Sequence, residues 1–96
     1  MNTSSIRIIG GRHKSYRIVF KATPALRPTT DRAKETLFSW LQFELENKSC
    51  LDLFAGTGSL GLEALSRGAQ HVTFVEKEKN LYKNIIKNIS NLGYEN

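Results

Sequence analysis

The sequence predicts an α/β fold in which a β-hairpin precedes an incomplete parallel sheet. Three observations lead to this class. Two β-rich runs lie near the N-terminus, a helical pattern follows them, and from residue 49 short apolar runs alternate with helical patterns. Such alternation is typical of parallel sheets, because parallel neighbours are joined by helical crossovers.

The composition indicates one small globular domain. The chain has 96 residues, of which 40% are hydrophobic and 24% charged, and no apolar run approaches the roughly 18 residues of a membrane span. Its N-terminus has no long apolar stretch typical of a secretory signal. The single cysteine, Cys50, has no internal disulfide partner. We therefore expect a cytoplasmic protein that makes no contact with membranes.

The predicted hairpin pairs residues 6–10 with residues 16–22 across a polar connection that begins at Gly10 and Gly11. Strand alternation puts Tyr16, Ile18 and Phe20 on one face, which is apolar and suited to packing. The opposite face carries Arg17, Val19 and Lys21 and displays two cations.

Positive charge is concentrated in the same segment. The chain has a net charge of +5, and residues 1–30 contain six basic residues and no acidic one. Residues 31–96 contain eight basic and nine acidic residues. A basic segment without counter-charges is typical of a surface that binds a polyanion, so we expect nucleic acid as its partner.

The next predicted element is a helix over residues 31–45, with Thr30 or Asp31 as its N-cap. A stripe at helical spacing predicts its buried face, which consists of Ala33, Leu37, Phe38, Trp40 and Leu41.

Two strand–helix units follow. We expect strands over residues 49–54 and 71–76 and helices over residues 59–67 and 79–92, with Gly93 directly after the last helix. The last helix presents an apolar face that consists of Leu81, Ile85, Ile89 and Leu92. A doubly wound sheet needs more than two strands, so we expect a fragment of a longer protein.

The turn between the first strand and its helix reads GTGSLG, from Gly56 to Gly61. This pattern fits G-x-G-x-x-G, and Glu76 lies 20 residues beyond Gly56 at the end of the next strand. A carboxylate there accepts hydrogen bonds from ribose hydroxyls in nucleoside-binding βαβ units. A tight turn without any ligand is the alternative.

Asp52 distinguishes between two candidate cofactors. It lies four residues before Gly56, near the carboxyl end of its strand. A carboxylate at this place repels the pyrophosphate of NAD and attracts the ammonium group of S-adenosylmethionine. We therefore favour S-adenosylmethionine, and an NAD-binding domain is the alternative.

Several longer stretches extend this interpretation: IRIIGGRHKSYRI, LRPTTDRAKETLFSWL, CLDLFAGTGSLGLEALSRGA and VTFVEKE. Together they resemble the N-terminal half of the RsmD family of bacterial methyltransferases. The resemblance implies a Rossmann-like, S-adenosylmethionine-dependent methyltransferase fold with an N-terminal β-hairpin. It also implies methylation of a guanine N2 amine in small-subunit ribosomal RNA, with ribosomal RNA or a small-subunit particle as the partner.

The resemblance, together with the residue patterns, gives two candidate sites. The predicted cofactor-binding residues are Asp52, Phe54, Ala55, Gly56, Thr57, Gly58, Glu76 and Lys77. The predicted RNA-binding residues are Arg7, Arg12, Lys14, Arg17, Lys21 and Arg27. We divide the chain into an RNA-binding hairpin and loop over residues 1–28 and the first part of a methyltransferase domain over residues 29–96.

The chain departs from the family in one respect. The family's target-binding motif contains two adjacent prolines, whereas the two prolines here, Pro24 and Pro28, are separate and precede the glycine turn. We therefore assign no catalytic residue and expect the chain alone to be inactive. The histidines and the cysteine do not have the spacing of metal ligands. A DNA or RNA adenine-N6 methylase and a non-catalytic RNA-binding module remain as alternative functions.

Overall fold

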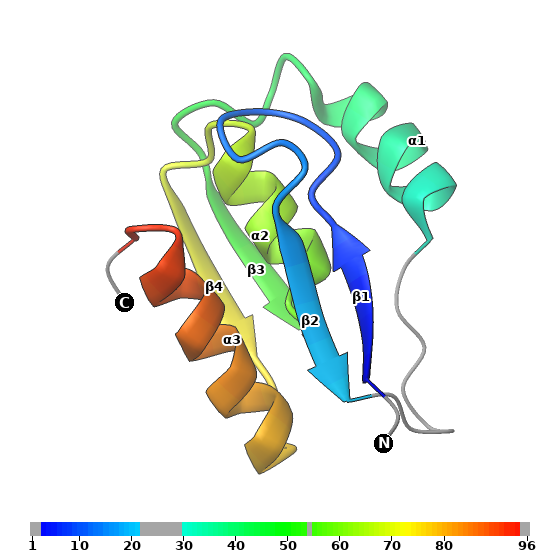
Figure 1. The fold of residues 1–96 in the computed structure, drawn as a ribbon. Helices are drawn as coiled ribbons and strands as arrows, with labels where there is room; N and C mark the ends of the chain where they lie inside the picture. Colours follow the sequence, from blue (N-terminus) through cyan, green and yellow to red (C-terminus); the bar gives the residue numbers. More distant parts are fainter. Residues whose placement is uncertain (1–2, 22–29, 54, 95–96) are drawn as a thin grey trace.

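The computed structural model describes residues 3–21, 30–53 and 55–94 and has the predicted order of elements (Figure 1). Its elements are β1 (Thr3–Arg7), β2 (Arg17–Lys21), α1 (Asp31–Leu41), β3 (Ser49–Leu53), α2 (Ser59–Ser66), β4 (His71–Val75) and α3 (Lys79–Asn91). The predicted α/β class is therefore confirmed. None of the described helices has both the length and the apolar character needed to cross a membrane.

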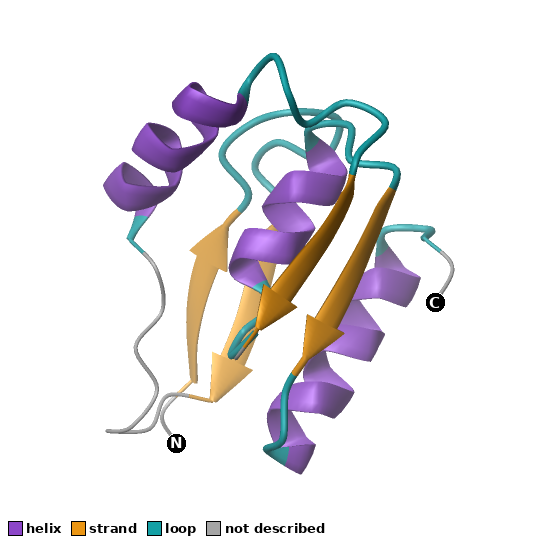
Figure 2. Cartoon of the chain, turned by 180° about the vertical axis from the view of Figure 1, so that it is seen from behind, coloured by secondary structure: helices purple, strands orange, loops and turns teal. Residues whose placement is uncertain are grey.

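Strands β3 and β4 pair in parallel, with Asp52 opposite Phe74 and Leu53 opposite Val75. Helix α2 forms the crossover between them, and α2 and α3 lie on the same side of this sheet (Figure 2). No described element covers the opposite face, and Leu51 and Leu53 there are 61% and 57% exposed. A parallel sheet with one uncovered face is unusual, because helices normally cover both faces.

Strands β1 and β2 form the predicted antiparallel hairpin, in which Arg7 lies opposite Arg17. Ile18 and Phe20 are buried, and Arg17, Val19 and Lys21 are exposed, so the predicted faces are confirmed. The first strand was expected over residues 6–10 but ends at Arg7. The Ile8 amide still donates to the Tyr16 carbonyl, but the amides of Ile9 and Gly10 donate instead to the carboxylate of Glu63 in α2.

Helix α1 begins as predicted, because the Thr30 hydroxyl accepts a hydrogen bond from the Ala33 amide. Its expected buried stripe is wrong in part. Phe38 is buried, but Ala33 is exposed and Trp40 is 75% exposed. Lys34 takes the buried position instead, because its ammonium group finds a carboxylate partner, Glu63, inside the protein. The helix also ends at Leu41 rather than at residue 45.

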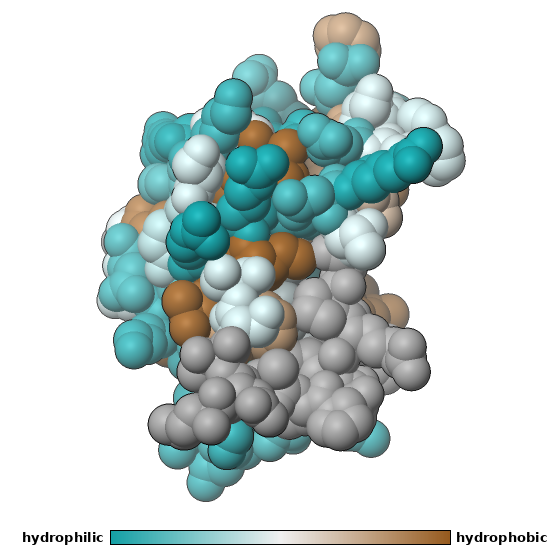
Figure 3. All heavy atoms as spheres, turned by 45° about the vertical axis from the view of Figure 1, so that its right-hand side comes forward, coloured by the Kyte–Doolittle hydropathy of each residue, from teal (hydrophilic) through white to brown (hydrophobic). Residues whose placement is uncertain are grey.

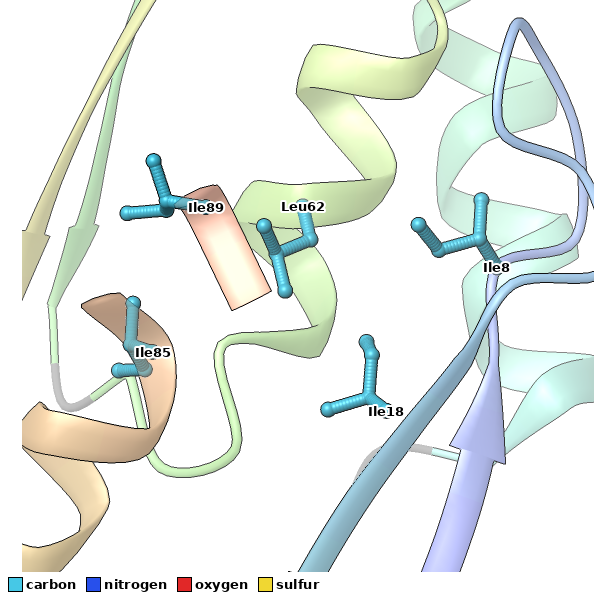
Figure 4. Packing of buried hydrophobic residues seen from close by; sticks show 5 residues of the cluster. All are labelled: Ile8, Ile18, Leu62, Ile85 and Ile89. Atoms are coloured by element: carbon cyan, nitrogen blue, oxygen red, sulfur yellow. The ribbon is translucent and has the colours of Figure 1, made fainter. Parts of the chain in front are cut away.

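The hairpin and the rest of the chain share one hydrophobic core. Ile8 and Ile18 of the hairpin region point toward Leu62 of α2, beside Ile85 and Ile89 of α3 (Figure 4). The last two residues confirm the apolar face predicted for the final helix. A second cluster joins Phe38 to α2, so α2 is packed between the hairpin, α1, α3 and the sheet.

Polar contacts also fasten the hairpin to α3. The Tyr16 hydroxyl donates a hydrogen bond to Oδ1 of Asn88 at 2.6 Å, and Nδ2 of Asn84 donates one to the carbonyl of Val19 at 2.9 Å. The hairpin is thus an integral layer of the fold.

Candidate cofactor site and basic surface

The glycine turn connects β3 to α2 at the carboxyl ends of the parallel strands, where open α/β sheets bind ligands. Gly56 and Gly58 both adopt positive φ angles, of 59° and 83°, which side chains disfavour. Gly61 has a different role, because a Cβ there would overlap the ring of Phe74 in β4. The three glycines therefore shape the turn and bring α2 close to the sheet.

The carboxylate of Glu76 holds this turn in place. Its Oε1 accepts a hydrogen bond from the Gly56 amide at 2.8 Å, and its Oε2 accepts one from the Glu78 amide at 2.9 Å. The Ala55 amide donates to the carbonyl of Val75 at 2.9 Å and continues the link between the two strand ends. The acid that follows β4 and the glycine turn are thus in direct contact, an interaction that the spacing alone did not predict.

Asp52 lies in β3 beside the start of α2. Its Oδ2 accepts a hydrogen bond from the Gly61 amide at 3.1 Å. Burial raises the pKa of Asp52 above 3.8, the Gly61 hydrogen bond lowers this pKa, and the Glu76 carboxylate raises it. Two carboxylates therefore act on the same small region, which favours a cationic ligand over an anionic one.

The remaining predicted cofactor residues lie around the same turn. Thr57 is buried, its hydroxyl accepts a hydrogen bond from the Ser59 amide at 3.3 Å, and Gly58 begins α2 as its N-cap. Lys77 is exposed and directly follows Glu76. Phe54 lies outside the described residues. The turn thus gathers seven of the predicted residues, namely Asp52, Ala55, Gly56, Thr57, Gly58, Glu76 and Lys77.

The predicted basic residues form an exposed surface on the hairpin. Arg7, Arg12, Lys14, Arg17 and Lys21 are all exposed, whereas Arg27 lies outside the described residues. Arg7 and Arg17 are direct cross-strand neighbours, an arrangement of like charges that destabilises a hairpin. The charge of Arg7 is partly neutralised by Asp31, whose Oδ2 lies 3.3 Å from Nε of Arg7. This ion pair is exposed and contributes little to stability.

The basic surface extends along β2, from the connection between β1 and β2 to Lys21 at the end of β2. The connection that carries Arg12 and Lys14 lies beside the C-terminal end of α2, because the Arg12 amide donates to the carbonyl of Ser66. Strand β2 then descends, and Lys21 ends it on the side where β3 and β4 also end (Figure 1). Figure 3 brings the side with α1 forward and shows that hydrophilic residues predominate there, with hydrophobic residues between them.

The sequence did not predict the roles of three charged residues that hold the helices in place. Lys34 and Glu63 are fully buried and paired, and Glu78 caps α3 by accepting hydrogen bonds from the Asn80 and Leu81 amides. A signal for Glu63 was present, since it is the one charged residue in the otherwise apolar or small SLGLEALS stretch.

The chain matches the family model described as "Conserved hypothetical protein 95" over residues 6–96. Among curated proteins, it is 47% identical over 90 residues to Ribosomal RNA small subunit methyltransferase D of Escherichia coli K12, covering 94% of this chain and 46% of that protein. It is 48% identical over 93 residues to the protein of the same name from Buchnera aphidicola, covering 97% and 49%. The chain thus spans about half the length of the curated relatives it matches.

Solved structures give the same result. The candidate methyltransferase yhhF of Escherichia coli aligns with a TM-score of 0.81 and 47% identity over 93% of this chain and 49% of that one. A hypothetical protein of Thermus thermophilus aligns with a TM-score of 0.77 and 32% identity over 94% and 52%. The fold is accordingly part of a Rossmann-like methyltransferase fold. Because the family model covers residues 6–96 and both the curated relatives and the solved structures match almost the whole chain, the protein belongs to the RsmD family.

Proposed function

We propose that this chain is the cofactor-binding and RNA-contacting part of an S-adenosylmethionine-dependent methyltransferase that acts on a guanine N2 amine of small-subunit ribosomal RNA. The relatives' names support a ribosomal RNA substrate. The guanine N2 position comes from the family resemblance. We further propose that the basic surface contacts RNA in a small-subunit particle or in free ribosomal RNA.

The observation that carries the proposal is the pair of carboxylates around the glycine turn. Asp52 is partly desolvated and held by the Gly61 amide, and Glu76 is fixed by two backbone amides. The two negatively charged hydrogen-bond acceptors therefore fit a ligand with an ammonium group, a sulfonium group and ribose hydroxyls, and they do not fit a pyrophosphate.

Each group has a defined task in this proposal. Asp52 binds the ammonium group, Glu76 accepts hydrogen bonds from the ribose hydroxyls with its remaining lone pairs, and the Gly56–Gly58 backbone allows close approach. The bound cofactor supplies an electrophilic methyl group. The basic hairpin holds the phosphates of the RNA, and methyl transfer then depends on the alignment of the target amine.

Calorimetric titration of S-adenosylmethionine into the chain tests the cofactor assignment. We expect saturable binding that Asp52→Asn weakens about tenfold or more, because a hydrogen bond to a charged group is lost. Asp31→Asn is the matched control, since it removes the same charge from α1 and leaves the glycine turn intact.

NADH serves as the competing ligand in the same experiment. Equal affinity of the wild-type and Asp52→Asn chains for S-adenosylmethionine, or preferential binding of NADH, contradicts the assignment. RNA binding without any S-adenosylmethionine binding favours a non-catalytic RNA-binding module instead.

A further inference from the structure

A buried cluster of charges lies away from the glycine turn, where α1, α2 and the hairpin meet. The side chains of Glu63 in α2 and Lys34 in α1 are both 0% exposed, with 3.5 Å between Nζ and Oε1. Arg67 completes the cluster, with its Nε 2.8 Å from Oε2 of Glu63. Buried ion pairs are weak contributors to stability, because desolvation offsets their attraction. Such a cluster therefore calls for a role other than stability.

Both buried side chains reach the backbone of the hairpin. Glu63 accepts hydrogen bonds from the amides of Ile9 and Gly10, each at 2.9 Å. Nζ of Lys34 donates to the carbonyl of Arg7 at 2.6 Å. Lys34 and Glu63 are thus hydrogen-bonded to the backbone where β1 ends and the basic connection to β2 begins.

Ser66, one turn further along α2, holds the next part of the connection. Its hydroxyl donates to the carbonyl of Gly10 at 2.6 Å and accepts from the His13 amide at 2.8 Å. Gly11 makes this contact possible, because its φ is +79° and a Cβ would overlap the carbonyl of Ser66. Residues 9–13 are therefore docked on α2 through their backbone, which leaves the Arg12 side chain exposed.

The other end of α2 carries the candidate cofactor site. The Gly61 amide, two residues before Glu63, donates to Asp52, and Gly58 begins the helix. Helix α2 has eight residues, which corresponds to a length of about 12 Å. One short rigid helix therefore links the glycine turn to the basic hairpin.

We propose that Glu63 is a positioning residue that fixes the basic hairpin relative to the glycine turn, so that RNA held along the hairpin presents its target base at a set distance from the methyl donor. This inference rests on the proposed function. A positioning role differs from a purely structural role in one respect. Loss of a positioning Glu63 weakens RNA binding and leaves S-adenosylmethionine binding intact.

The test uses the double variant Lys34→Met/Glu63→Leu in the whole chain. Apolar side chains of similar volume replace the buried pair, so neither Lys34 nor Glu63 is left as an unpaired buried charge and the packing between α1 and α2 is retained. Arg67 can turn to water, because its side chain is already 24% exposed. Glu44→Gln, which changes an exposed acid beyond α1, is the matched control.

Three quantities are measured for each variant: amide hydrogen exchange at Ile9 and Gly10, the Kd for S-adenosylmethionine, and the Kd for a small-subunit ribosomal RNA fragment. We expect exchange in the double variant to be about tenfold faster. We expect its Kd for RNA to rise about tenfold and its Kd for S-adenosylmethionine to stay within about twofold. Glu44→Gln should match the wild type in all three.

Two results for the double variant overturn the inference. Faster exchange with an unchanged Kd for RNA means that Glu63 holds the hairpin without serving RNA binding. An equal loss of affinity for both ligands means that α2 itself is damaged and that Glu63 is merely structural. A wild-type chain that binds neither ligand contradicts the proposed function itself, and the positioning role falls with it. This outcome is separate, because it is seen before any variant is made.

Discussion

Asp52 shows how a single residue can lower the stability of the folded protein. Its carboxylate is partly buried and lies in the field of the Glu76 carboxylate, and both effects raise its pKa. The folded protein therefore binds a proton at Asp52 more readily than the unfolded chain does. The stability that protonated Asp52 confers is complete below pH 3.8 and is lost as the pH rises through the higher pKa of the folded state.

We therefore expect Asp52→Asn to unfold at a higher temperature than the wild type at neutral pH. Asparagine keeps an acceptor for the Gly61 amide and removes the unfavourable charge. The difference should shrink as the pH falls toward the unfolded-state pKa, because wild-type Asp52 is then protonated. Thermal unfolding at several pH values checks this, and a variant that is less stable than the wild type at pH 7 contradicts it.

At the scale of elements, α2 is fitted against the sheet so closely that its third residue has to be glycine. A Cβ at Gly61 would overlap the Phe74 ring, and the Gly61 amide is also the donor to Asp52. The packing of α2 on β4 and the hydrogen bond to Asp52 thus depend on the same backbone position.

Gly61→Ala should lower the free energy of unfolding by about 1–2 kcal/mol, because overpacking outweighs the gain of about 1 kcal/mol in helix propensity. Urea denaturation measures this loss. The second-site variant Gly61→Ala/Phe74→Leu should recover part of it, since leucine has no ring at the contact. If Gly61→Ala alone is as stable as the wild type, α2 can move away from β4 without cost.

The sequence could predict the elements better than it could predict their contacts. Apolar spacing located the helices and strands, whereas the hydrogen bond from the Gly56 amide to Glu76 was not predicted. The sequence pattern wrongly placed Trp40 in the core. An amphipathic pattern assigns apolar side chains to the buried face and does not indicate that Lys34 is buried there instead. The burial of Lys34 depends on Glu63, which lies 29 residues away and belongs to a different helix. The SLGLEALS stretch singles out Glu63 as its one charged residue, but no local pattern indicates that Lys34 is its partner.

At the scale of the whole molecule, the chain has two very different outer surfaces. One is the bare face of the parallel sheet, where Leu51, Leu53 and Val75 are exposed. An exposed apolar face of this kind promotes association. The other is the basic face of the hairpin.

The double variant Leu51→Thr/Leu53→Thr should self-associate less than the wild type at high concentration. It should keep a similar midpoint of thermal unfolding, because both leucines are more than half exposed. Light scattering over a concentration series measures the first effect. Leu62→Ala is the contrasting control, since that leucine is fully buried and its truncation should cost about 2–5 kcal/mol. An unchanged scattering profile would mean that the bare face takes no part in association.

The basic face predicts RNA binding that depends strongly on salt. Arg7→Gln/Arg17→Gln should reduce the slope of log affinity against log salt concentration by about 1.4 for single-stranded RNA, because two phosphate contacts are lost. Lys79→Gln/Lys83→Gln removes the same net charge from exposed positions of α3 and should change the slope little. Filter-binding titrations at several salt concentrations measure both slopes. Equal effects of the two pairs would mean that only the total charge matters.

The bonds between the hairpin and α3 have a consequence for the order in which the protein is made. Tyr16 and Asn88 are separated by 72 residues, and Val19 and Asn84 by 65. At a synthesis rate of about 5–20 residues per second, the ribosome needs about 4–14 s to add α3 after the hairpin has been polymerised. During this interval the inner face of the hairpin, with Ile18 and Phe20, lacks its α3 partners. The N-terminal segment of the nascent chain is then open to chaperones until α3 emerges.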